Sequence, residues 1–274
     1  MATPDLSWAW APGPLIALAL SLTIYLLRWR RARRAGGATA AGGWRLVSFC
    51  AGLALIFVAL VTPVDRLGEQ LFVAHMAQHI LLIDLGPILL LLGLTGAVLG
   101  PVAVWLRRLE RRAGVLSHPA FAVVFYGATL WLWHAPAMYE LALREPLAHA
   151  VQHVHFLSAG LLFWWHLQSP IRMRKRLRGL AVVGYLFGAK LITGVLASAL
   201  AFTPLGLYAF YSEQPRWWGL SAVNDQRMAG GLMMTEELVA MTTAVVIVFI
   251  RMLGESERES DREQERHERS GLAR

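Results

Sequence analysis

Residues 44–62, WRLVSFCAGLALIFVALVT, decide the class of this protein, because this segment is long enough and apolar enough to cross a lipid bilayer. A helix that spans the hydrocarbon core needs about 20 mostly apolar residues, since each residue advances about 1.5 Å through a layer about 30 Å thick. After Arg45 the segment carries no charged residue. It therefore predicts a transmembrane helix.

Six more runs of this kind divide the rest of the chain. The other expected spans are residues 13–29, 75–95, 119–135, 149–167, 180–202 and 228–250. Backbone polar groups in lipid must be hydrogen-bonded within the segment, so each run is predicted to be a helix. We expect an all-α integral membrane protein, a bundle of seven transmembrane helices over residues 1–252. Residues 253–274, which alternate acids and bases, are expected to form a poorly ordered cytoplasmic tail or a single polar helix.

The composition agrees with a membrane protein. The 274 residues are 56% hydrophobic and 16% charged, whereas soluble domains are about 45–50% apolar and about 25% charged. These values exclude a soluble enzyme and a disordered chain. The net charge of +8 comes from short basic clusters between apolar runs, which orient a membrane protein and do not indicate nucleic-acid binding.

The basic residues also predict the orientation. Of the 26 Lys and Arg residues, 21 lie in alternate linkers and the tail, at residues 28–45, 107–112, 172–178 and 251–274. The other linkers contain four, which are Arg66, Arg144, Arg216 and Arg227. Because Lys and Arg accumulate on the cytoplasmic side, we expect the N-terminus outside and the C-terminus in the cytoplasm. The first apolar run precedes its basic cluster, unlike a cleaved signal peptide, so we expect it to be retained.

The histidines are the most informative polar residues. Six of the nine lie at the expected outer ends of three spans: His75 and His79, then His134, then His149, His153 and His155. Polar side chains within spans are energetically expensive and usually face a bundle interior or a cavity. Six imidazoles at one depth therefore predict a shared site.

Helical geometry sharpens this prediction. At about 100° per residue, His75 and His79 share one face of their helix, and so do His149 and His153. Two such pairs on neighbouring helices can bring four ring nitrogens to one volume, as helix bundles do for metals. His155 is turned away from this face.

The remaining candidate ligands suit more than one metal and do not choose among them. The single cysteine, Cys50, lies within an apolar run, so a metal site would use imidazole, carboxylate or thioether. Asp225 begins the last span, where it could bind the metal, orient an imidazole or cap its own helix. Met76, Met138 and Met228 are possible secondary ligands. Imidazole with thioether favours copper, whereas imidazole with carboxylate also suits zinc or iron.

Two pairs of charges fall within spans. Asp84 and Lys190 are expected near the middle of their helices, where they could form a buried pair, or Asp84 could be protonated. Asp84 lies on the face opposite His75 and is excluded from the metal site. Glu236 could carry protons or a cation inward or pair with another helix, and Glu237 points about 100° away from it.

The chain contains no P-loop, no H-E-x-x-H motif and no G-x-S-x-G motif, so we predict that it is not an enzyme. Four stretches instead resemble those of one family. Residues 75–82, HMAQHILL, resemble the H-M-x-Q-H-L-L-L signature of the CtaG-type (caa3) cytochrome c oxidase assembly factors. Residues 131–139, WLWHAPAMY, and the stretch from His149 to 153–156, HVHF, look like the next two motifs of that family. Residues 225–234, DQRMAGGLMM, are similar to its D-Q-x-x-A-G-x-x-M segment.

This resemblance implies a seven-helix, multi-pass protein of the bacterial plasma membrane that handles copper for a caa3-type haem–copper oxidase. Its implied partners are an oxidase subunit and a periplasmic copper donor. By motif, the functional residues would be His75, His79, His134, His149, His153 and Asp225. The chain departs from the family at residues 233–237, MMTEE, where an apolar M-W-x-P-G segment is expected, and at Asp84, which interrupts an apolar run.

We therefore expect a non-enzymatic assembly factor that holds copper through fewer than four strong ligands, with access from outside. One alternative is a b-type cytochrome with haem between two axial histidines. Another is a metal-ion transporter, which would need polar groups that continue through the membrane. A third is a structural partner whose histidines only form hydrogen bonds.

Overall fold

The computed structural model describes residues 3–171, 177 and 179–271, and every regular element within them is helical. The longer helices in chain order are α1 (Pro12–Ala40), α2 (Gly43–Val61), α4 (Phe72–Ile80), α5 (Gly86–Gly93), α7 (Pro101–Arg112), α8 (Pro119–His134), α9 (Pro136–Arg144), α10 (Pro146–Gln168), α11 (Leu180–Phe202) and α13 (Ala222–Gly271). The short helices are α3 (Pro63–Gly68), α6 (Gly96–Leu99) and α12 (Ala209–Glu213), with a π-helical turn at Leu81–Leu85 and 3₁₀ turns at Gly114–Ser117 and Trp217–Gly219. The all-α class is confirmed for these residues.

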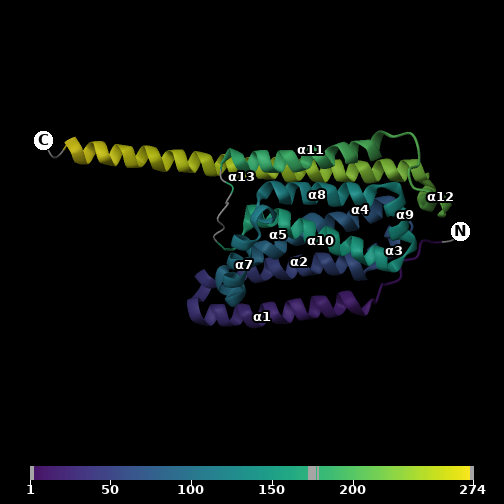
Figure 1. The fold of residues 1–274 in the computed structure, drawn as a ribbon, viewed down its shortest axis with the longest axis horizontal. Coiled ribbons are helices and arrows are strands. Elements are labelled where there is room, and N and C mark those ends of the chain that lie inside the picture. Colours follow the sequence, from purple (N-terminus) through teal and green to yellow (C-terminus); the bar gives the residue numbers. More distant parts are fainter. Residues whose placement is uncertain (1–2, 172–176, 178, 272–274) are drawn as a thin grey trace.

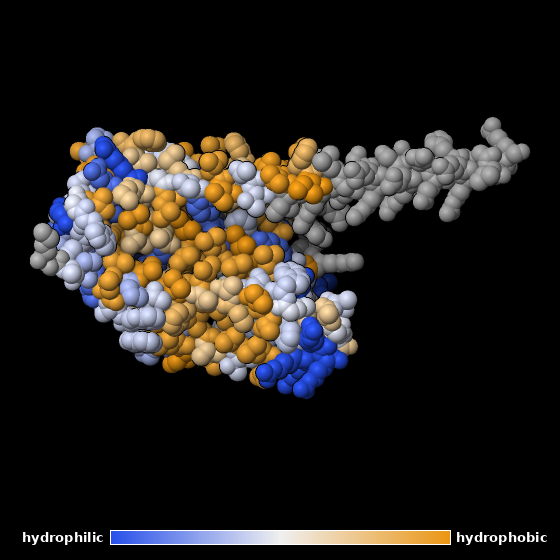
Figure 2. Space-filling model, turned by 180° about the vertical axis from the view of Figure 1, so that it is seen from behind, coloured by the Kyte–Doolittle hydropathy of each residue, from blue (hydrophilic) through white to orange (hydrophobic). Residues whose placement is uncertain are grey.

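Within the described residues, four helical segments are long and apolar enough to cross a membrane. These are α1, α2, the α4–α5 segment Phe72–Gly93, and α11, and the pair α8–α9 gives a fifth if its 72° bend lies within one span. α10 has 23 residues, but four histidines reduce its apolar character. The seven-span count therefore remains a prediction. Figure 2 shows apolar side chains over the middle of the bundle and hydrophilic ones toward its two ends.

Proline sets the boundaries that position the site. A proline occupies the first turn of α8, α9 and α10, where its missing N–H removes no helical hydrogen bond. The residue before a proline is pushed out of the helical region. Ala135, which precedes Pro136, accordingly has ψ 128° and ends α8 at His134. The bend between α8 and α9 thus places His134 at the C-terminus of α8.

The third apolar run is not one regular α-helix. Between α4 and α5 the chain forms the π-helical turn Leu81–Leu85, and Pro87 follows in the first turn of α5. α10 packs tightly against this turn, because a Cβ at Gly160 would overlap the carbonyl of Ile83. The turn and this glycine together hold α4 and α10, which carry the two histidine pairs, against each other.

The core lies between α4, α8, α10, α11 and α13, and α1 lies at its edge. α1 contributes few buried side chains, and Tyr25 stacks on Phe49 of α2 with ring centroids 3.7 Å apart. α13 runs beside α11 along the bundle (Figure 1). A Cβ at Gly230 of α13 would lie 2.4 Å from the backbone nitrogen of Ala201, so only glycine permits this close packing. α13 continues as a helix through residues 253–271, the segment expected as a tail or a polar helix.

Candidate metal site

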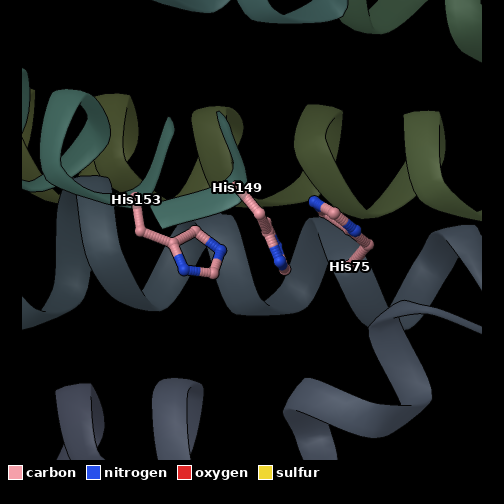
Figure 3. Close-up of side chains that lie close together, drawn as sticks. All are labelled: His75, His149 and His153. Atoms are coloured by element: carbon pink, nitrogen blue, oxygen red, sulfur yellow. The ribbon is translucent and has the colours of Figure 1, made fainter. Parts of the chain in front are cut away.

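Three of the predicted histidines form a compact group (Figure 3). His75 comes from α4, and His149 and His153 come from α10, and one ring nitrogen from each lies within 4.8 Å of the other two. Two nitrogens bound to one ion at about 2.1 Å lie at most about 4.2 Å apart. The three nitrogens lie slightly farther apart than the ligands of one ion, so the side chains would have to move closer together to bind it. We refer to His75, His149 and His153 as the histidine group.

One ring nitrogen of each histidine in this group is buried without a partner among the described residues. The Nε2 atoms of His75, His149 and His153 have no hydrogen-bond partner among the described residues. Buried polar atoms in proteins are nearly always hydrogen-bonded, so unpaired ones need an explanation. Three unpaired imidazole nitrogens in one place are the donor set that a metal ion of intermediate or soft character requires.

The hydrogen bonds of His75 leave its Nε2 lone pair available. Tyr211 donates its hydroxyl hydrogen to the carbonyl of Gly68 at 2.7 Å, and burial raises the pKa of this phenol well above its usual value. His75 Nδ1 lies 3.1 Å from Tyr211 Oη and 3.3 Å from the same carbonyl. Because the hydroxyl of Tyr211 donates its own hydrogen to Gly68, both this hydroxyl oxygen and the Gly68 carbonyl can only accept from His75. His75 Nδ1 therefore carries the hydrogen. A neutral ring held in this way presents the Nε2 lone pair.

His79 lies directly beside the histidine group. Its ring centroid is 4.2 Å from that of His75 and 5.9 Å from that of His153. Its side chain is buried, and neither ring nitrogen has a partner among the described residues. His79 is thus the nearest candidate for a fourth ligand.

His134 and Met76 form a separate contact on the other side of His79. The ring centroid of His134 lies 6.2 Å from that of His79. Its Nδ1 donates to the carbonyl of Leu130 at 2.8 Å, so its Nε2 lone pair faces Met76 Sδ at 3.2 Å. This nitrogen and this sulfur are both soft enough to bind copper, although they lie outside the histidine group.

Asp225 lies at the start of α4 and not in the histidine group. Its two carboxylate oxygens accept the backbone N–H groups of Phe72, at 2.7 Å, and Val73, at 2.9 Å. A carboxylate at a helix N-terminus satisfies otherwise unpaired N–H groups and interacts favourably with the helix dipole. The sequence suggested that Asp225 could bind the metal, orient an imidazole or cap its own helix. Its contacts are those of a cap, but the helix that it caps is α4.

The remaining candidates are two methionines and His155. Met228 is 49% exposed, and Met138 packs against the hydrophobic core. His155 accepts a hydrogen bond from Trp133 Nε1 at 3.2 Å, which agrees with the expectation that it turns away. Among the candidate thioethers, Met76 is the one that contacts a histidine.

Sequence reasoning missed three tyrosines around the site. Besides Tyr211, the ring of Tyr139 lies 5.2 Å from that of His75, and Tyr208 donates to the carbonyl of His134 at 2.9 Å. Tyr208 and Tyr211 belong to the segment between α11 and α13 (Figure 1). A tyrosine near a span end is usual at a membrane interface, so nothing in the pattern distinguished these residues.

The fold and the histidine group together define a class: helical membrane proteins with converging, unpaired imidazoles at one depth. The family can be stated as well. The model of the cytochrome c oxidase caa3 assembly factor family (Caa3_CtaG) matches residues 23–255, and the chain belongs to this family. The resemblance seen in the four sequence motifs is thereby confirmed.

The curated relatives are longer proteins from mycobacteria. "Uncharacterized protein ML1998" of Mycobacterium leprae is 26% identical over 275 residues, which cover 92% of this chain and 40% of the relative. "Uncharacterized protein Mb0105" of Mycobacterium bovis is 27% identical over 286 residues, which cover 96% of this chain and 41% of the relative. The chain thus spans about two fifths of the length of the relatives it matches. No solved structure matches the chain.

Proposed function

We propose that this protein is a non-catalytic assembly factor that holds copper at the histidine group and transfers it to a subunit of a caa3-type haem–copper oxidase. The observation that carries this proposal is the convergence of one ring nitrogen each from His75, His149 and His153 within 4.8 Å. Membership of the oxidase assembly family supports the partner. Copper is here the cargo of the protein and not a resident cofactor.

The ligand chemistry supports copper and transfer. Imidazole ligands accept several transition metals, and the sulfur of Met76, which lies beside His134 and outside the histidine group, offers copper a second, softer binding position nearby. Three nitrogens leave a coordination position free for an incoming ligand, as in metal sites that exchange their ligands. Zinc is the competing ion, because it also binds imidazole well.

The proposal includes a topology. Seven spans with the N-terminus outside, in the bacterial plasma membrane, place the histidine group toward the outer face. This arrangement is supported by the alternation of basic residues between linkers. A periplasmic copper donor would load the group from that side, and the oxidase subunit would receive the ion there.

Metal analysis of purified protein tests the proposal. After loading with copper and desalting, the wild-type chain is expected to retain about one ion, and His75→Ala and His149→Ala are expected to lose it. His155→Ala is the matched control, because His155 lies on the same helix but contacts Trp133. Equal copper in wild type and both ligand variants would remove the assignment. A Soret band in the untreated protein would instead support the haem alternative.

A further inference from the structure

A buried ionic cluster lies outside the histidine group, in the interior of the bundle. Lys190 Nζ of α11 lies 3.5 Å from Asp84 Oδ2 and 3.1 Å from Glu236 Oε2 of α13. The side chains of Lys190 and Asp84 are 5% and 2% exposed. The buried pair expected between Asp84 and Lys190 is therefore present, and Glu236 makes it a triad that joins three separate segments.

The two acids of the triad differ in their hydrogen bonds. Asp84 accepts from Tyr126 Oη at 2.8 Å and from Trp164 Nε1 at 2.7 Å, in addition to Lys190. Within the described residues, Lys190 is the one donor to Glu236. Donors stabilise the ionised form of a carboxyl group. Asp84 therefore accepts from three donor groups, whereas Glu236 accepts from one.

A third acid leaves the cluster with excess negative charge. Glu237 packs against α11, with its Oε2 3.1 Å from where a Cβ of Gly194 would lie. Three carboxylates and the single ammonium of Lys190 would leave two negative charges uncompensated in a medium where unpaired charge is expensive. Pairing of Asp84 with Lys190 and a proton on Glu236 remove one of these two uncompensated charges.

A small cavity joins this cluster to the histidines. Its volume of about 20 Å³ is room for about one water molecule. Its lining includes Met76, His79 and His134 together with Asp84, Glu236 and Glu237. His79 is buried with both ring nitrogens unpaired among the described residues. One water molecule in the cavity would therefore have polar partners toward both groups.

We propose that binding of a monovalent cation at the histidine group is coupled to release of the proton held by Glu236. This inference rests on the proposed copper-binding function. Imidazoles are neutral ligands, so an arriving Cu⁺ adds one positive charge to the interior. When the O–H bond of Glu236 breaks and its proton leaves for the outer solution, the carboxylate restores the balance. One ion enters, one proton leaves, and nothing is oxidised or reduced.

Proton counting tests the coupling. Purified protein in weakly buffered detergent solution is titrated anaerobically with Cu⁺, and a pH-indicator dye reports the protons released per bound ion. Wild type is expected to release about one proton more per bound ion than Glu236→Gln. For each unit of increase in pH, the Cu⁺ affinity of the wild type is expected to rise about tenfold more than that of Glu236→Gln. Glu236→Asp keeps the carboxyl group and should keep the release. Glu213→Gln, at an exposed carboxylate of α12, is the matched control and should behave as wild type.

The outcomes of the proton count distinguish failure of the coupling from failure of the proposed function. Equal proton counts for wild type and Glu236→Gln, with copper bound by both, would overturn the coupling and leave the copper site standing. Failure of the wild type to bind Cu⁺ would overturn the proposed function and the coupling with it. Should Glu236→Gln not fold, the proton count of the wild type decides alone, because neutral imidazole ligands release no proton: a wild type that binds Cu⁺ and releases none would overturn the coupling.

Discussion

The carboxylate of Asp225 caps α4 through the backbone N–H of Phe72, at 2.7 Å, although 153 residues separate the two in sequence. The contact fixes the N-terminus of the helix that carries His75. Asp225→Ala is expected to lower the free energy of unfolding by about 1–2 kcal/mol, the usual effect of losing a cap. Asp225→Asn keeps one acceptor oxygen and should lose less.

Thermal unfolding in detergent measures this effect, and copper retention measured on the same samples shows whether α4 still positions its histidine. Asn224→Ala is the control, because the Asn224 side chain is exposed at the neighbouring position. An Asp225→Ala protein as stable as this control would show that the cap does not hold α4 in place.

Tyr211→Phe is predicted to weaken copper binding without removing a ligand. The substitution deletes the oxygen that accepts from His75 Nδ1–H at 3.1 Å. Loss of such an outer partner usually lowers metal affinity about 10–100-fold, because the ring orientation and basicity change. Competition with a Cu⁺ chelator measures the affinity.

The control for this variant is Tyr185→Phe, which removes a buried hydrogen bond to the carbonyl of Phe163, remote from the histidine group. It should reduce stability and leave the affinity for Cu⁺ unchanged. Equal affinities in Tyr211→Phe and Tyr185→Phe would show that Tyr211 has no role at the site.

Local periodicity explains how much of the site was predictable from sequence. The pairs His75–His79 and His149–His153 each lie within one helix, so their shared faces follow from the helical repeat. The contacts of Asp225 and Tyr211 join distant segments, and no local pattern encodes them. The π-helical turn at Leu81–Leu85 likewise could not be predicted, because Asp84 is the one break in the apolar run there and does not specify a π-helical turn.

The membrane-spanning helices could be predicted only in part from hydropathy. Hydropathy predicted helices at α1, α2 and α11, and each of them is a helix long and apolar enough to cross a membrane. α10 is less apolar, because it carries the histidines that the site requires. α10, which carries two members of the histidine group, is thus not among the candidate spans of the described residues.

Met76→Leu is predicted to change the choice of metal. The substitution nearly conserves volume, so packing should be kept, but it removes the sulfur that lies 3.2 Å from His134 Nε2. Affinity for Cu⁺ is expected to fall about tenfold, equivalent to about 1.4 kcal/mol. Affinity for Zn²⁺ should stay the same, because zinc gains little from a thioether.

Parallel titrations with the two ions measure this preference, and Met228→Leu, at an exposed position, is the control. A parallel fall for both ions would mean that Met76 acts through packing. No change for either ion would exclude its sulfur from copper binding.

Gly160→Ala is predicted to disrupt the site from a distance, because the added Cβ would overlap the carbonyl of Ile83. Backbone cannot move aside as a flexible side chain does, so α10 must separate from the π-helical turn, and overpacking of this kind typically costs about 1–3 kcal/mol. Since α10 carries two members of the histidine group and α4 the third, copper retention should fall together with thermal stability. Gly188→Ala places a methyl group where nothing lies within 4 Å and should retain both. Full copper retention in a destabilised Gly160→Ala protein would show that the histidine group does not depend on this helix contact.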